Sequence, residues 1–129
     1  MTIDLPTYTV AVVDDDASML RSAVRFLQTA GYVAKGFTSA AEFLDMIGAS
    51  VVDCAIIDVQ MPRLNGFELS TELEKRGIKL PIFYMTAHDS PWTRDQVAEH
   101  RGQGLLIKPF NPQRLLDVLA SMLKPGGSA

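Results

Sequence analysis

Residues 51–66, VVDCAIIDVQMPRLNG, contain an apolar run that ends at Asp58 and is followed by proline, asparagine and glycine. A short apolar run bounded by turn residues is typical of a strand that is covered on both faces of a sheet. Polar residues end three other apolar runs in the same way: Asp14 with Asp15, Thr86, and Lys108. Because the carboxyl ends of parallel strands meet at one edge of a sheet, we expect these side chains to lie together.

Strand and helix patterns alternate along the whole chain. The expected strands are residues 8–13, 32–37, 53–57, 81–85 and 105–107. A helix-forming segment follows each strand, and four of these segments have a capping residue at their start: Asp16, Ser39 (with capping-box spacing to Glu42), Ser90 and Asn111. Five such units imply an α/β fold with a doubly wound parallel sheet and five helices. The mixed pattern of 32–37 fits an edge strand and favours the flavodoxin-like strand order 2-1-3-4-5.

Composition excludes several classes of protein. The 129 residues fit one domain, and a net charge of −3 without a basic run gives no electrostatic basis for direct binding to nucleic acid. Cys54 is the only cysteine and lies in an apolar run, so we expect a buried thiol and no disulfide. No segment has the length or character of a membrane span or a signal peptide, which predicts a soluble, cytoplasmic protein.

From about Thr9 to Leu123 the chain resembles the receiver domain of two-component response regulators. The residues that carry the resemblance are Val12-Val13-Asp14-Asp15-Asp16, Ile57-Asp58 with Met61-Pro62 and Gly66, Met85-Thr86-Ala87, and Lys108-Pro109-Phe110. Each motif alone is weak, but their order at the ends of the expected strands is specific. The resemblance implies a receiver domain at residues 1–124, followed by a flexible tail at 125–129.

The resemblance also implies that Asp58 accepts a phosphoryl group from a histidine kinase or a histidine phosphotransfer protein. Mg²⁺ is the implied cofactor, held by Asp14, Asp15 and Asp58 together with the backbone carbonyl of Gln60. The chemistry of the residues agrees, because clustered carboxylates repel one another and favour a hard divalent cation. In this scheme Asp58 is the nucleophile. The two remaining site residues contact the phosphoryl oxygens: Lys108 through its ammonium and Thr86 through its hydroxyl.

The expected function is a phosphorylation-dependent signalling switch that does not turn over an external substrate. Phosphorylation is expected to shift the face formed by the fourth helix, the fifth strand and the fifth helix. The fourth helix, after Ser90-Pro91, is polar and should be weakly anchored. The partners expected to respond to phosphorylation are a downstream protein or an effector domain beyond Ala129. A homodimer through the same face is a further option.

Two features depart from the usual receiver pattern. Leu105 stands where these domains usually carry a tyrosine or phenylalanine, and Gly102-Gln103-Gly104 is an irregular entry to the last strand. His88 and His100 are expected to face solvent because neither has a metal-ligand partner at a suitable spacing. For Trp92, at the start of the polar helix, contact with a partner and incidental exposure remain equally open.

Two rival functions come from other classes. A phosphatase of the haloacid dehalogenase type would use Asp14, Asp16 and Ser18, but a helix is expected directly after Asp16, and Asp58 would have no role. A receiver-like binding scaffold that is not phosphorylated would require the loss of a key residue, and none is lost.

Overall fold

The computed structural model describes residues 7–49 and 51–123, whose five strands form one parallel sheet in the order β2-β1-β3-β4-β5. The strands are β1 (Thr9–Val13), β2 (Val33–Phe37), β3 (Cys54–Asp58), β4 (Ile82–Thr86) and β5 (Gly104–Ile107). The helices are α1 (Ala17–Thr29), α2 (Ala40–Ile47), α3 (Gly66–Lys75), α4 (Pro91–Glu99) and α5 (Pro112–Met122). The predicted fold class, strand order and edge strand are confirmed. The predicted domain end at residue 124 and the predicted tail at 125–129 lie outside the described residues.

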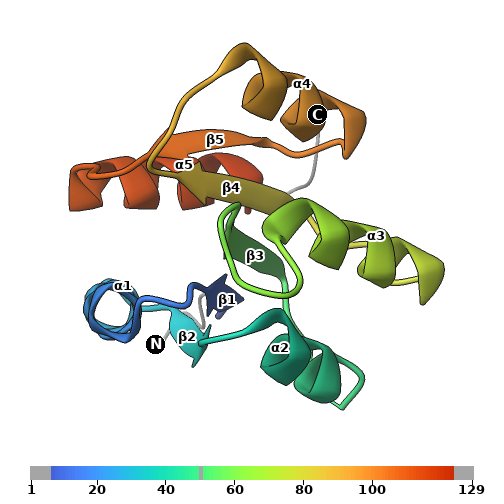
Figure 1. Ribbon diagram of the computed structural model, residues 1–129. Helices are drawn as coiled ribbons and strands as arrows, with labels where there is room; N and C mark the ends of the chain where they lie inside the picture. Colours follow the sequence, from blue (N-terminus) through green and yellow to red (C-terminus); the bar gives the residue numbers. More distant parts are fainter. Residues whose placement is uncertain (1–6, 50, 124–129) are drawn as a thin grey trace.

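Helices cover both faces of the sheet (Figure 1). On one face α1 and α5 pack over alternate strand residues such as Val10 and Val12. On the other face α2, α3 and α4 pack over the intervening residues, such as Ala11 and Val13. Cys54 is fully buried, as predicted, and burial raises the pKa of its thiol to about 12. This two-sided burial explains why the central strands are continuous apolar runs.

The helix caps follow the sequence in part. Asp16 caps α1 by accepting hydrogen bonds from the backbone N–H groups of Ser18 and Met19. Ser39 accepts from the N–H of Glu42, but the Glu42 carboxylate bonds to Thr38 rather than back to Ser39, so the predicted reciprocal capping box is wrong. The reciprocal arrangement occurs instead at α3, between Asn65 and Glu68.

Helix α4 is held by few buried side chains. Ser90 caps it and Pro91 occupies its first turn, as predicted, but only Thr93 and Val97 are buried. Few buried contacts are typical of elements that move at low energetic cost. Of the helices in the described part of the chain, none has the length and apolar character needed to cross a membrane.

Gly66 is a position where the fold has no room for a side chain. A Cβ atom there would lie 2.6 Å from the backbone oxygen of Asp58. We therefore expect Gly66→Ala to lower the free energy of unfolding by about 1–3 kcal/mol, because a backbone atom must shift to relieve the clash. Urea denaturation followed by circular dichroism would measure the change.

Gly48→Ala is the matched control for this substitution. Gly48 has φ −70° and a Cβ atom added there would meet nothing within 4 Å. Its replacement should be neutral or stabilise by up to about 1 kcal/mol through the unfolded state. Equal unfolding free energies for the two variants would contradict the assigned role of Gly66.

Candidate functional site

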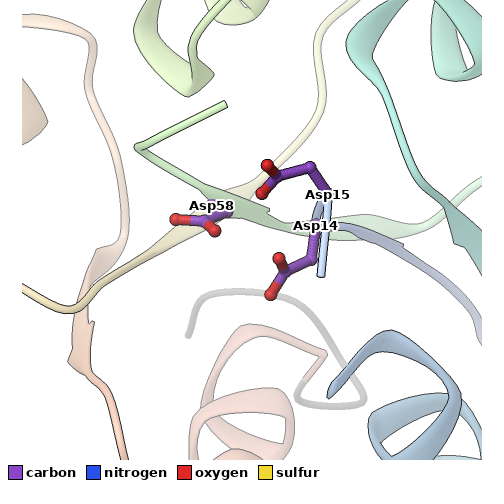
Figure 2. A group of neighbouring side chains, drawn as sticks. All are labelled: Asp14, Asp15 and Asp58. Carbon is purple, nitrogen blue, oxygen red and sulfur yellow. The ribbon is translucent and has the colours of Figure 1, made fainter. Parts of the chain in front are cut away.

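The five polar residues expected at the strand ends do meet at the carboxyl edge of the sheet. Asp58 and Thr86 are the last residues of β3 and β4, whereas Asp14 and Lys108 directly follow β1 and β5. Figure 2 shows the side chains of Asp14, Asp15 and Asp58 in one small region, with Asp14 and Asp15 on one backbone segment and Asp58 on another. One carboxylate oxygen from each of these aspartates lies within 4.8 Å of the others.

Lys108 connects two of the three carboxylates. Its Nζ atom donates to Asp14 Oδ2 at 2.8 Å and to Asp58 Oδ2 at 2.9 Å. Asp14 is fully buried and Asp58 is 4% exposed, so this ammonium offsets the cost of burying their charge. The other oxygen of each aspartate accepts a backbone N–H, from Asp16 at 2.9 Å and from Gln60 at 3.1 Å.

The site holds opposing electrostatic effects. Burial raises the pKa of Asp58 to about 6; Lys108 opposes the shift through its hydrogen bond and its charge, and the charge of Asp14 adds to it. Burial alone would lower the pKa of Lys108, but hydrogen bonds to Asp14 and Asp58 outweigh it and raise that pKa above its usual value. Lys108 is therefore a permanent cation beside a carboxyl group that is harder to ionise than usual.

A divalent cation fits this set of donors. When all are ionised, the three carboxylates and the one ammonium leave two negative charges unmatched. Oxygen ligands of this kind suit Mg²⁺, which keeps several waters in its shell. Asp15 is exposed, so the cluster is open to solvent on that side. These observations make Asp14, Asp15 and Asp58 a candidate metal site.

The hydroxyl of Thr86 is held by a partner that the sequence did not suggest. Thr86 is fully buried, and its Oγ1 atom lies 3.0 Å from Gln60 Oε1, to which it can donate. The carbonyl of His88 is an alternative acceptor at 3.2 Å, and the N–H of His88 donates to Thr86 Oγ1 at 3.1 Å. From the sequence, only the backbone carbonyl of Gln60 was expected to have a role, as a ligand of Mg²⁺. Nothing in the sequence indicates that its side chain contacts Thr86.

Three further residues test the expectations from sequence. Asp16 lies outside the carboxylate cluster of the described residues, because its side chain caps α1. His100 was expected to face solvent, and this prediction is wrong: it is partly buried and its ring stacks on Phe67, with centroids 5.3 Å apart. His88 is exposed, as predicted.

Comparisons with known proteins agree with the family resemblance seen in the sequence. The family model described as the response regulator receiver domain matches residues 10–120. Nodulation protein W of Bradyrhizobium diazoefficiens is 37% identical over 115 residues, which are 87% of this chain and 49% of that protein. Transcriptional regulatory protein TdiR of Thauera aromatica is 34% identical over 115 residues, 89% of this chain and 51% of that protein. The chain therefore spans about half the length of these curated relatives.

Solved structures agree on the fold. The chemotaxis protein CheY4 of Vibrio cholerae has a TM-score of 0.86 and 30% identity, covering 91% of this chain and 99% of that one. A response regulator receiver protein from Burkholderia phymatum has a TM-score of 0.79 and 38% identity, covering 90% of this chain and 94% of that one.

Proposed function

Because the chain belongs to the response regulator receiver domain family, we propose that it is a switch in which Asp58 accepts a phosphoryl group with the help of Mg²⁺. The observation that carries the proposal is the position of Asp58. It ends the central strand β3, lies almost buried beside two other carboxylates, and contacts the ammonium of Lys108. A carboxylate in this setting is suited to attack phosphorus, because a cation and a metal can offset the charge that gathers there.

The reaction requires one bond to form and one to break. A carboxylate oxygen of Asp58 attacks the phosphorus of a phosphodonor such as phosphohistidine, and the donor's bond to phosphorus breaks as the imidazole leaves. The product is an acyl phosphate. Mg²⁺, held by Asp14, Asp15, Asp58 and the carbonyl of Gln60, would supply neutralising charge and orient the phosphoryl oxygens.

The protein's own groups then respond to the phosphoryl group. Lys108 lies 2.9 Å from Asp58 Oδ2, so its ammonium is already within reach of phosphoryl oxygens attached to that side chain. Thr86 has a single hydroxyl hydrogen, which is donated here to Gln60 Oε1 or to the carbonyl of His88. This hydrogen bond must break before the hydroxyl can donate to the phosphoryl group. Breaking this contact would link phosphorylation to movement of the end of β4.

The remaining partners belong to the same proposal. A histidine kinase or histidine phosphotransfer protein would supply the phosphoryl group, and the α4, β5 and α5 face would carry the response to a downstream protein, an effector domain or a second copy. The half-length match to the curated relatives supports an effector domain in a longer protein. A receiver unit over residues 1–124, a cytoplasmic location and the lack of direct contact with nucleic acid remain predictions from the sequence.

The phosphatase alternative has less support from the geometry. It needs Asp14 and Asp16 to act together, whereas the Asp16 carboxylate bonds the first turn of α1 and Asp14 is paired with Lys108. The scaffold alternative would leave the paired, nearly buried Asp58 without a function.

Incubation of the protein with phosphoramidate and Mg²⁺ tests the proposed function. We expect intact-mass spectrometry to show the addition of one phosphoryl group, which hydroxylamine removes because the linkage is an acyl phosphate. Turnover of p-nitrophenyl phosphate without a labelled protein would support the phosphatase instead. If the protein is not labelled and also shows no turnover, the scaffold would be supported.

A further inference from the structure

Tyr84 lies beside the position where the usual aromatic residue is replaced by Leu105. The register of β4 and β5 pairs these two residues directly, and both pack into the apolar cluster under α3 and α4. Tyr84 is fully buried, whereas Leu105 is only partly buried. An aromatic ring with a hydroxyl group is therefore present on this face of the sheet. It lies on β4, one strand closer to the centre of the sheet than the position at which receiver domains usually carry an aromatic residue.

Gly102, before β5, and Gly104, its first residue, make room for the aromatic rings of β4. A Cβ atom at Gly102 would lie 2.6 Å from Cε2 of Tyr84, and one at Gly104 would lie 2.6 Å from Cζ of Phe83. Phe83 packs against the opposite apolar cluster, under α1 and α5. The glycines at 102 and 104 thus leave space for the two rings, and Leu105 pairs with one of them, Tyr84, across the strands.

The hydroxyl of Tyr84 connects β4 to the loop after Asp58 through hydrogen bonds. Ser70 Oγ lies 3.2 Å from the carbonyl of Gly66, to which it can donate, and it is also hydrogen-bonded to the hydroxyl of Tyr84. The N–H of Gly66 in turn donates at 3.1 Å to the carbonyl of Val59, the residue after Asp58. Tyr84 also lies two residues before Thr86 on the same strand, and hence on the same face of the sheet.

Phe67 extends this connection to both ends of α4. Its ring lies 4.8 Å from that of Tyr84, stacks on His100 at 5.3 Å, and meets Trp92 edge-on at 6.0 Å, measured between centroids. Trp92 is in the first turn of α4 and His100 follows its last residue. We call Phe67, Tyr84, Trp92 and His100 the aromatic cluster. Because only Thr93 and Val97 of α4 are buried, these aromatic contacts supply a substantial part of the packing that holds the helix in place.

We propose that Tyr84 and Phe67, rather than the residue at position 105, couple the acceptor site to α4. Rearrangement of the loop after Asp58 and of Thr86 is transmitted through the Gly66–Ser70–Tyr84 hydrogen bonds to the aromatic cluster, and α4 is repositioned with it. Tyr84 and Phe67 act as positioning residues and do not touch the reacting atoms. The inference rests on the proposed function, because it concerns what phosphorylation moves.

Trp92 provides the readout because it is the only tryptophan and is 59% exposed. Phosphoramidate and Mg²⁺ should change its fluorescence in the wild-type protein. Tyr84→Phe removes only the hydroxyl and should lose most of this change, as should Phe67→Leu, whereas Leu105→Ala should keep it. Mass spectrometry of each sample gives the phosphorylated fraction, and hydrogen exchange of the α4 amides gives a second readout that does not depend on the tryptophan.

The outcomes separate the two proposals. A wild-type protein that takes no phosphoryl group overturns the proposed function and, with it, this inference. A wild-type protein that is phosphorylated without any change at Trp92 or in α4 overturns the inference alone. So does a phosphorylated Tyr84→Phe variant that keeps the full wild-type response. Because Tyr84→Phe leaves the ring in place, this test stands even if Phe67→Leu fails to fold.

Discussion

Replacement of Asp58 by asparagine should abolish phosphorylation by phosphoramidate and Mg²⁺. The amide keeps the shape of the side chain and can still accept the backbone N–H of Gln60, but it lacks the anionic oxygen that attacks phosphorus. We therefore expect complete loss of the hydroxylamine-sensitive mass increase that the wild-type protein shows. Intact-mass spectrometry under identical conditions makes the comparison.

Asp16→Asn is the matched control for this loss. It makes the same charge change near the site, and asparagine caps helices about as well as aspartate, so α1 should be preserved. The variant should be labelled like the wild-type protein, whereas a phosphatase that relies on Asp16 would be inactivated. A normal label in Asp58→Asn, or its loss in Asp16→Asn, would show that the acceptor has been misassigned.

Replacement of Asp15 by asparagine should weaken Mg²⁺ binding by about tenfold or more, since an anionic oxygen is lost from a hard cation's shell. Asp15 is the exposed member of the carboxylate cluster, so the change should leave the buried pair of Asp14 and Lys108 intact. Isothermal titration calorimetry measures the affinity. Asp16→Asn again serves as the control, because it removes a neighbouring charge that lies outside the cluster. Equal losses in the two variants would indicate a general charge effect rather than a ligand.

The same titration should depend on pH in a defined direction. Burial raises the pKa of Asp58 to about 6, and a protonated carboxyl group is a poor ligand for Mg²⁺. Affinity should therefore increase as the pH rises through this region and level off above it. Asp58→Asn should remove this part of the pH dependence, and an unchanged profile in that variant would assign it to another group.

The helix starts illustrate how far local sequence patterns reach. Asp16 and Ser90 were identified as caps correctly, because a cap depends on a backbone that is only a few residues away. The reciprocal capping box predicted for Ser39 forms instead at Asn65, since the partner of the glutamate depends on the residue before the cap. At α2 that neighbour, Thr38, offers its own N–H and hydroxyl to Glu42 and captures the carboxylate.

Sequence alone determined the strands, their order and the gathering of Asp14, Asp58, Thr86 and Lys108 at one edge. Apolar runs and turn residues are local signals, and parallel strands bring their carboxyl ends together whatever the details of packing. Only the tertiary structure decided that Lys108 bridges two aspartates, that Gln60 holds Thr86, and that Phe67 joins α3 to both ends of α4. These contacts join residues far apart in the chain, and a shift of about an ångström in sheet twist or helix packing is enough to make or break such a hydrogen bond.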